Sequence, residues 1–396
     1  MKSYINEICA KYTTARDVRE MGIYPYYRPI SSGQDPIVQM ADGTKVLMFG
    51  SNSYLGLSDD PRLKEAAIAA IKKYGTSCSG SRFLNGTLDL HEELEAKICK
   101  FVGKEDAVTY STGFQVNLGV VSSLGFRGGY ILLDDTDHAC IIDGSRLAWS
   151  TVYKFRHNDM TVLEKKLRAC EPEAPKLIVV DGVYSMLGDL CPLPTICELA
   201  EKYNATVMVD DAHGLGVFGE NGSGTASHFG LTDRTDLIMG TFSKSFGSLG
   251  GFIAGDRDII DFLRHNSRSL IFSASMTPAA AAAASKALDI MIEEPQRREH
   301  LWDVTRYAWK CFRDNGFDIN ATQSPIIPLM VRDTLKAMKI VTLAYNAGVF
   351  ITPVIAPAVP EKDVLIRFAL MATHERSHVD EAVEKLTKIF KDLEVI

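Results

Sequence analysis

The sequence predicts an α/β fold with a mostly parallel central sheet in a large domain and a smaller α+β domain at the C-terminus. From about residue 60, short apolar runs alternate with longer segments of helical periodicity. These runs are apolar throughout, which is typical of strands covered on both faces. Beyond Pro278 the regular alternation gives way to helices mixed with a few strands. These three observations determine the predicted fold class.

The N-terminal segment, residues 1–55, predicts one helix followed by a pair of strands. Apolar side chains recur at helical spacing within the first 22 residues, at Ile5, Ile8, Cys9 and Tyr12. The run IVQMADGTKVLMF then indicates a β-hairpin, because its Asp-Gly pair is a favoured two-residue turn.

Residues 56–290 contain the strands of the expected central sheet. The six candidates are AVTY (107–110), YILL (130–133), KLIVV (176–180), TVMV (206–209), DLIMG (236–240) and GFIAG (251–255). Helical patterns lie between most of them, for example at residues 160–170 and 195–203. Since strand and helix alternate, we expect a large domain whose sheet is covered by helices on both faces.

Residues 291–396 predict the smaller domain. A long alanine-rich helix runs from Pro278 to about Met291, and the pair Glu294-Pro295 marks a break after it. The runs PIIPLMV and VLIRFAL, within the last hundred or so residues, are the strand candidates of this domain.

Composition restricts the classes of function. The chain has 396 residues and a net charge of −7, which argues against a general nucleic-acid-binding protein. None of the eight cysteines forms a CxxC pair, so we expect no metal site and a reduced, cytoplasmic protein. The sequence shows no signal-peptide pattern and no apolar run of bilayer-spanning length, although weak association with a membrane surface stays open.

Polar side chains follow five of the predicted strands. Ligands of such sheets bind outside the carboxyl ends of the strands, so these residues are expected to meet at one edge. The five segments are Ser111 to Phe114, Asp134 to His138, Asp181 to Ser185, Asp210 to His213, and Thr241 to Lys244. Each alone has an ordinary structural explanation, such as a helix cap, a satisfied histidine or a surface lysine. Five together favour a binding site.

Lys244 lies in TFSKSFGSLGG, directly after a buried strand. A partly desolvated lysine has a lowered pKa and becomes a nucleophile toward carbonyl groups. Pyridoxal phosphate (PLP) uses such an amine, and it also needs a carboxylate at its ring nitrogen, a phosphate cradle and a group on its ring face. Lys244, Asp210, the turn from Ser111 to Phe114 with Thr241, and His138 would supply these four groups. A metal site at Asp210-Asp211-Ala-His213 is disfavoured, because no further ligand has matching spacing.

Several motifs together resemble the α-oxoamine synthase family. They include SNSYLGLSDDPRL, GTSCSGSRFLNGTLDLHEELE, DDTDHACIIDG, VVDGVYSMLGDLCPL, VMVDDAHGLGVFGENGSG, TFSKSFGSLGG and IFSASMTP, in that order. The resemblance covers the chain from about residue 24 onward. It implies a PLP-dependent transferase of fold type I, the aspartate-aminotransferase fold, which condenses an amino acid with an acyl-CoA and in most members releases carbon dioxide.

The resemblance also implies roles for individual residues. Lys244 would form the Schiff base, Asp210 would pair with the pyridinium nitrogen, and His138 would stack on the ring. The remaining cofactor contacts would come from Ser111, Gly113, Phe114, Thr241 and Ser243 at the phosphate or ring, and from His213 and Ser185 at the phenolic oxygen. Ser273 and Ala274 would reach the phosphate from a second subunit, which implies a homodimer. Asn52 and Arg367 would hold the substrate carboxylate, although Arg367 has a salt bridge on a strand as its alternative.

The motifs TFSKSFGSLGG and GSRFLNGT favour one branch of this family. That branch condenses L-serine with palmitoyl-CoA to give 3-ketosphinganine, CoA and carbon dioxide, the first step of sphingolipid synthesis. The glycine after His213 departs from many bacterial members of the branch, so glycine with acetyl-CoA, or alanine with pimeloyl-CoA, stay as alternatives. Transamination is disfavoured by the acyl-CoA motifs, and a silent partner subunit by the presence of Lys244.

Overall fold

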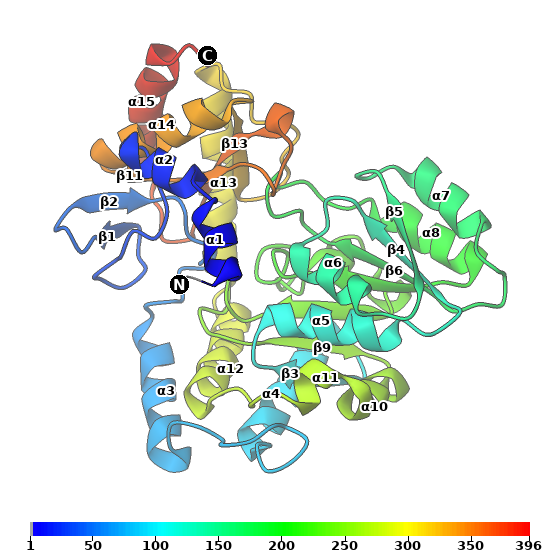
Figure 1. Ribbon diagram of the computed structural model, residues 1–396. Coiled ribbons are helices and arrows are strands. Elements are labelled where there is room, and N and C mark those ends of the chain that lie inside the picture. The colour runs from blue at the N-terminus through cyan, green and yellow to red at the C-terminus, as the bar shows by residue number, and fades with distance from the viewer. Residues whose placement is uncertain (1–2) are drawn as a thin grey trace.

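The computed structural model describes residues 3–396. Figure 1 shows two lobes, with the large sheet and its helices in one and the C-terminal helices and strands in the other. Among the helices of residues 3–396, none offers the continuous apolar length that a bilayer crossing requires.

The large lobe is built on a seven-stranded sheet in the order β3-β9-β8-β7-β6-β4-β5. Its strands are β3 (Asp106–Tyr110), β4 (Tyr130–Asp134), β5 (Thr151–Phe155), β6 (Lys176–Asp181), β7 (Thr206–Asp210), β8 (Leu237–Thr241) and β9 (Gly251–Gly255). All neighbours are parallel except β9, which is antiparallel to both β8 and β3. Residues 242–250 are too short for a crossover helix, so β9 returns antiparallel beside β8.

The predicted mostly parallel sheet and all six predicted strands are confirmed, and the sequence missed only β5 among the strands of this sheet. β5 lies at the sheet edge, and only Phe155 of its five residues is buried. Its sequence TVYKF therefore lacks the continuous apolar character that marks the inner strands.

Helices cover both faces of the sheet, which explains the apolar strands. In β6, Leu177 and Val179 pack into the cluster under α5 (Gly113–Leu124), α6 (Ala139–Arg146), α10 (Arg257–Asn266) and α11 (Arg268–Ile271). Ile178 and Val180 point into the cluster on the other face. That face is covered by α4 (Asp89–Val102), α7 (Met160–Arg168), α8 (Leu193–Tyr203), α9 (Thr225–His228) and α12 (Pro278–Glu293). Successive side chains of a strand alternate between faces, so a doubly covered strand has no polar side.

The small lobe contains two three-stranded sheets. β1 (Ile37–Gln39) and β2 (Lys45–Met48) form the predicted antiparallel pair. On its other side, β2 pairs in parallel with β11 (Val349–Phe350). The other sheet has the order β10 (Ile326–Met330), β13 (Leu365–Ala369) and β12 (Thr352–Val354). The lobe also contains α13 (Pro295–Asp314), α14 (Thr334–Asn346), α15 (Arg376–Asp392) and the 3₁₀ helix η2 (Glu361–Asp363). The N-terminal strand pair is thus part of the sheet that the C-terminal lobe completes.

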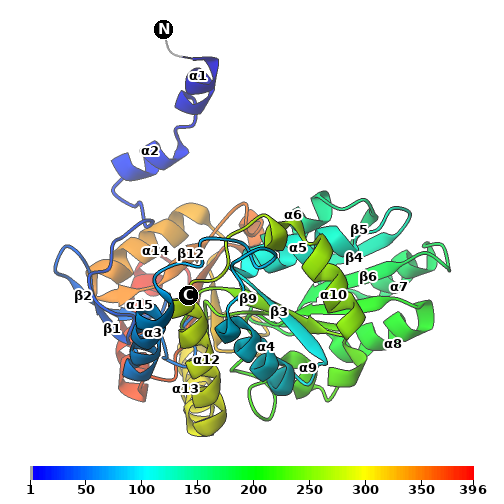
Figure 2. The same cartoon turned by 90° about the horizontal axis from the view of Figure 1, so that it is seen from below.

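The prediction of one helix over the first 22 residues is wrong for the described part, and residues 1–2 lie outside the described residues. The segment forms two helices, α1 (Tyr4–Ala10) and α2 (Thr14–Glu20). The hydroxyl of Thr13 donates to Asp17 over 2.9 Å, a local bond of the kind that competes with helix continuation. α1 buries none of its side chains, so no packing favours a longer helix. Figure 2 shows both helices extending away from the two lobes.

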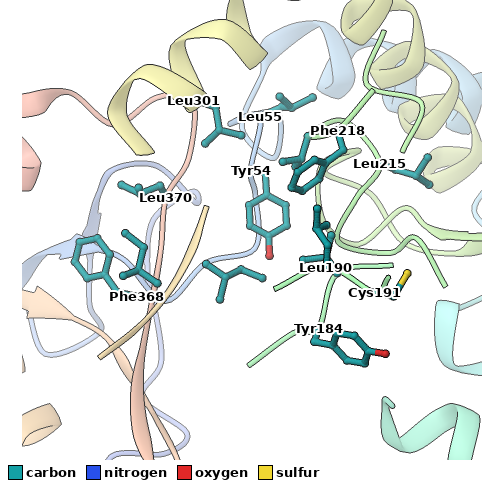
Figure 3. Close-up of a cluster of buried hydrophobic side chains, with 14 of the residues drawn as sticks. Tyr54, Leu55, Tyr184, Leu190, Cys191, Leu215, Phe218, Leu301, Phe368 and Leu370 are labelled. Atoms are coloured by element: carbon teal, nitrogen blue, oxygen red, sulfur yellow. The ribbon is translucent and has the colours of Figure 1, made fainter. Parts of the chain in front are cut away.

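The two lobes share one hydrophobic core. Figure 3 shows Tyr54 between Phe218 of the large lobe and Phe368 and Leu370 of the small lobe. Tyr54 follows β2 in a segment that leads to α3 (Pro61–Tyr74), and α3 contacts α12. Phe218 and Phe368 are 4% and 0% exposed, so the junction between the lobes is as well buried as the interior of either lobe.

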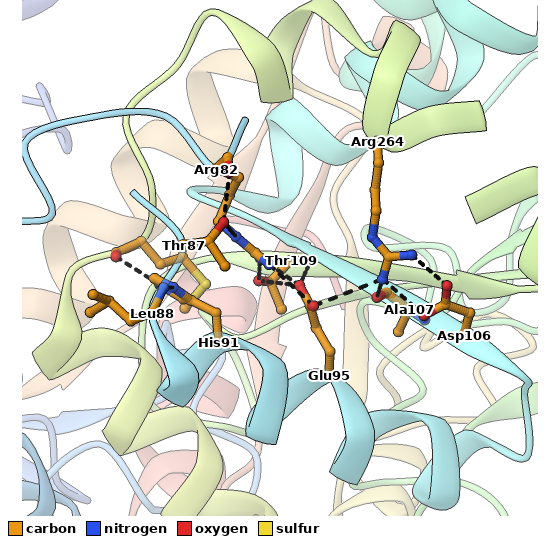
Figure 4. Close-up of polar contacts among 10 residues, drawn as sticks. Arg82, Thr87, Leu88, His91, Glu95, Asp106, Ala107, Thr109 and Arg264 are labelled. Atoms are coloured by element: carbon orange, nitrogen blue, oxygen red, sulfur yellow. Dashed lines mark hydrogen bonds and ion pairs between the residues drawn. The ribbon is translucent and has the colours of Figure 1, made fainter. Parts of the chain in front are cut away.

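A buried ion pair anchors the segment GSRFLNGT to the sheet (Figure 4). Arg82 donates to Glu95 of α4 over 2.5 Å and to the hydroxyl of Thr109 of β3 over 2.6 Å. Glu95 also accepts from the backbone amide of Thr109 over 2.7 Å. On the far side, Arg264 of α10 pairs with Asp106, the first residue of β3. These contacts hold β3 at both ends, and β3 leads directly into the segment that starts at Ser111.

Candidate functional site

A cavity of about 260 Å³ lies at the carboxyl ends of the central strands. All five strand ends that the sequence singled out contribute to it. The lining residues are Thr112, Gly113, Phe114, Asn117, His138, Cys140, Asp181, Asp210, Ala212, His213, Met239, Thr241, Ser243, Lys244 and Leu249. The structure thus brings together Gly113, Phe114, His138, Asp210, His213, Thr241, Ser243 and Lys244 among the predicted site residues.

Lys244 follows the end of β8 and faces this cavity. Burial lowers the pKa of its ammonium group to about 8, although the carboxylates of Asp210 and Asp181 oppose the shift. A lysine with this pKa is partly neutral near physiological pH, and only the neutral amine attacks a carbonyl carbon. The position and the lowered pKa together fit an amine that binds an aldehyde.

The N-terminus of α5 forms one wall of the cavity. Thr112 caps the helix by accepting a hydrogen bond from the amide of Gln115 over 3.2 Å. Gly113 is required there, because a Cβ on it would lie 2.7 Å from the hydroxyl oxygen of Thr241. The first amides of a helix have no partner within the helix and attract anions. This wall is therefore suited to a phosphate group.

Asp210 ends β7 and is buried in the cavity wall. One carboxylate oxygen accepts from the side-chain amide of Asn117 over 2.5 Å, and the other accepts from the backbone amide of Ala212 over 3.0 Å. The two donors hold the carboxyl group in one orientation. A carboxyl group fixed at this depth is suited to pair with a ring nitrogen.

His138 is the residue from which α6 starts, and its ring lines the cavity. Its Nδ1 lies 2.7 Å from the sulfur of Cys140 and accepts from the amide of the same cysteine over 3.3 Å. Burial lowers the pKa of His138, which favours the neutral imidazole. A neutral, fixed ring can stack on a flat ligand.

His213 connects the cavity to the small lobe through Tyr54. The Tyr54 phenol oxygen lies 2.7 Å from Nδ1 of His213 and accepts from Arg367 over 3.1 Å. Arg367, on β13, also donates to the side-chain oxygen of Asn52 over 2.8 Å and to the carbonyl of Ser185 over 2.8 Å. Burial lowers the pKa of His213 well below its usual range, and the nearby Lys244 and Arg367 cations lower it further.

The remaining predicted residues lie outside the cavity wall. Asn52 and Arg367 bind each other behind it, and Ser185 contributes its carbonyl to Arg367 rather than a hydroxyl to the wall. Ser111 donates to the carbonyl of Ala274. Ser273 accepts from the side chain of Gln115 over 2.8 Å. The segment with Ser273 and Ala274 thus lies against the start of α5 in the same chain.

The residues present fit PLP on two observations. Gly113 leaves the backbone at the start of α5 open to a phosphate, because a side chain there would meet Thr241. Asp181 lines the cavity with a buried carboxylate oxygen that has no hydrogen-bond partner among residues 3–396. Burial raises the pKa of Asp181 well above its usual range, the Asp210 carboxylate adds to the shift, and Lys244 opposes it. The cavity is therefore lined by an amine, a carboxylate, an anion cradle and an imidazole that can stack on a ring.

Sequence reasoning missed Tyr54, Asn117 and Cys140. Asn117 and Cys140 could have been found, since Asn117 lies one helical turn after Gly113 and Cys140 follows the singled-out His138 by two residues. Tyr54 carries no such signal, because His213 lies 159 residues farther along the chain. Its polar partners come together only through the packing of the two lobes.

The comparisons with known proteins agree with this geometry. Residues 44–386 match the family described as aminotransferase class I and II. The chain is 56% identical over 394 residues to a serine palmitoyltransferase from Sphingobacterium spiritivorum, covering 100% of this chain and 98% of that one. It is 41% identical over 380 residues to an 8-amino-7-oxononanoate synthase from Petrotoga mobilis, covering 96% of each chain.

A solved structure of serine palmitoyltransferase from S. paucimobilis superimposes on the whole chain with a TM-score of 0.96 at 30% identity, and both chains are covered completely. The predicted fold type I and the predicted resemblance are therefore confirmed. The chain belongs to the class I and II aminotransferase family, and its full-length relatives include the serine palmitoyltransferases.

Proposed function

We propose that the protein condenses L-serine with a long-chain acyl-CoA, palmitoyl-CoA in the first instance, to give 3-ketosphinganine, CoA and carbon dioxide. The observation that carries the proposal is Lys244, which lines one cavity with Asp210 in a chain 56% identical to a serine palmitoyltransferase over its full length. The product would enter sphingolipid synthesis. We also propose a cytoplasmic location, where the eight free cysteines stay reduced.

PLP, when bound, supplies an aldehyde that takes up an amine and a ring that withdraws electrons from the carbon next to that amine. The Lys244 amine would hold the aldehyde and, once serine has displaced it, would take the proton from serine Cα. Its pKa of about 8 suits both roles, because the amine is available as a base and can return a proton near neutral pH.

Other residues would orient the reactants. Asp210 would hold its charge at the ring nitrogen, and His138 would lie on the ring face. The start of α5, with Thr241 and Ser243, would bind the phosphate. His213 would donate to the phenolic oxygen, with Ser185 as the second predicted contact. Asn52 and Arg367 would bind the serine carboxylate and hold the bonds at Cα in the orientation that favours their cleavage.

Serine Cα loses its proton and forms a bond to the thioester carbonyl carbon, and the carbon–sulfur bond breaks so that CoA leaves as the thiol after taking up a proton. The bond from Cα to the carboxylate then breaks and releases carbon dioxide. A proton replaces the lost group at Cα, and Lys244, which lines the cavity, would deliver it.

A substrate panel tests this proposal. The holoenzyme is mixed with serine, glycine, alanine or threonine, and release of CoA is followed with acetyl-, pimeloyl- and palmitoyl-CoA. We expect turnover with serine and palmitoyl-CoA, and rejection of alanine because it leaves the groups around the serine hydroxyl unpaired. Preference for glycine with acetyl-CoA, or for alanine with pimeloyl-CoA, would overturn the substrate assignment. In either case the fold and the cofactor site would stand.

The proposal includes a homodimer with shared sites. Two features support it. The resemblance to the α-oxoamine synthases implies that the Ser273–Ala274 segment reaches the partner's phosphate site. The N-terminal segment that contains α1 and α2 also exposes apolar side chains, since Tyr4, Ile5 and Tyr12 are more than 60% exposed. Mixing two inactive variants, Lys244→Ala and Ser273→Ala with Ala274→Leu, is expected to restore part of the activity through heterodimers. A monomer in sedimentation experiments with full activity at high dilution would contradict it.

A further inference from the structure

Asn117 is a wholly buried amide that contacts the carboxylate of Asp210. Its side-chain nitrogen donates to Asp210 over 2.5 Å and also lies 3.0 Å from the sulfur of Cys140. Its side-chain oxygen has no hydrogen-bond partner among residues 3–396. The two contacts of the amide nitrogen therefore determine how this side chain is oriented, and the shorter one is to the carboxylate.

The donor to Asp210 holds its carboxylate in place. Asp210 shares the cavity with the carboxyl of Asp181 and the amine of Lys244. A hydrogen bond from an amide to a carboxylate is directional and is lost when the carboxylate turns away. Ala212 binds only the other oxygen, so Asn117 is the side chain that holds the oxygen Oδ2.

Asn117 also lies on the helix that offers the anion cradle. It follows Gly113 by four residues on α5, so the two lie about one helical turn apart on the same face, and both line the cavity. One helix therefore presents its N-terminal amides to the cavity and also contacts Asp210. The separation between these two features is determined by the helix geometry.

We propose that Asn117 is a positioning residue that keeps the Asp210 carboxylate directed at the ring nitrogen of PLP, so that α5 holds both ends of the cofactor. The proposal rests on the proposed function only in that PLP is the cofactor. It predicts an effect on cofactor binding that depends on the ring nitrogen. A residue needed only for packing would have an effect that does not.

The test compares PLP with its 1-deaza analogue, in which a carbon replaces the ring nitrogen. Wild-type protein, Asn117→Ala and Asn117→Asp are freed of cofactor, and the dissociation constant of each ligand is measured by spectroscopic titration. Ser122→Ala serves as the control, because Ser122 lies farther along α5 and its hydroxyl donates to the carbonyls of Leu118 and Gly119 within the same helix. Asn117→Asp keeps the size of the side chain but removes its N–H donor.

For PLP, we expect both Asn117 variants to bind about ten- to a hundredfold more weakly, the range that loss of a hydrogen bond to a buried charged group produces. For the deaza analogue, variants and wild type should agree within about twofold, as for independent sites. Equal weakening for both ligands, or no weakening for PLP, would overturn the proposal. Ser122→Ala should resemble wild type with both ligands.

The measurement separates this proposal from the proposed function, because it requires no turnover. A selective loss of PLP binding in a protein that does not use serine and palmitoyl-CoA would support the role of Asn117 and reject the substrate assignment. Failure of the wild-type protein to bind PLP would reject both.

Discussion

The phenol of Tyr54 lies 2.7 Å from Nδ1 of His213 and 3.1 Å from a guanidinium nitrogen of Arg367. One fully buried side chain therefore joins a residue of the cavity wall to the arginine of β13. His213 follows β7 of the large lobe, and Arg367 belongs to β13 of the small lobe. Tyr54 therefore couples the predicted cofactor site to the predicted carboxylate site across the lobe junction.

Tyr54→Phe is expected to lower kcat/KM for serine by roughly ten- to a hundredfold, because it removes the partner of Nδ1 of His213 and one of the hydrogen bonds of Arg367. Steady-state kinetics with varied serine measure this effect. Tyr74→Phe is the matched control, since its hydroxyl bonds to Asp89 on the surface. If both variants kept wild-type kinetics, Tyr54 would have no coupling role.

The pKa of Lys244 gives a prediction for pH dependence. Burial lowers this pKa to about 8, so in the cofactor-free protein the neutral amine forms as pH rises through that value. The rate at which PLP is taken up should rise with pH and level off above about 8. In Asp210→Asn the midpoint should move to lower pH, because the carboxylate that favours the ammonium form is gone. Stopped-flow absorbance at several pH values measures both rates, and a midpoint near that of an exposed lysine would contradict the assignment.

His157 gives a prediction for stability. Burial alone would lower its pKa, but Asp134 and Asp189 raise the pKa of His157 from 6.5 to about 10. The folded state therefore binds the proton more tightly than the unfolded chain. The stabilisation is complete below about pH 6.5 and is lost as pH rises through about 10.

His157→Gln should consequently be destabilised most at pH 6, and the difference from wild type should shrink toward pH 10. Urea unfolding followed by circular dichroism measures it. His265→Gln is the control, because its partner Asp261 and His265 itself are mostly exposed. A constant difference across this pH range would show that His157 does not gain its proton from the ion pairs.

The Arg82–Glu95 pair predicts a large effect on stability. Both side chains are at most 10% exposed, so Arg82→Leu leaves Glu95 buried with only its longer contact of 3.9 Å to Arg264. Such losses cost roughly 3–5 kcal/mol in unfolding free energy. Arg146→Leu, which breaks an exposed pair with Asp143, should cost less than about 1 kcal/mol. Chemical denaturation compares the two, and similar small values would contradict a structural role for the GSRFLNGT segment.

Much of the site was predictable because strand ends meet at one edge of a parallel sheet. Lys244 and His138 each follow a buried strand within four residues and Asp210 ends one, so local pattern and topology placed them together. Local pattern failed where contacts are long-range, as for Tyr54. It also failed where packing is absent, as in α1, whose apolar spacing suggested a longer helix than the exposed segment forms.

The most direct test of the account is the identity of the lysine that holds the cofactor. The holoenzyme is treated with borohydride, which fixes a bound PLP to its lysine, and the digested protein is analysed by mass spectrometry. We predict that the modified peptide contains Lys244 and that Lys244→Ala yields no modified peptide and no turnover. Modification of a different lysine, or undiminished turnover in Lys244→Ala, would contradict the account.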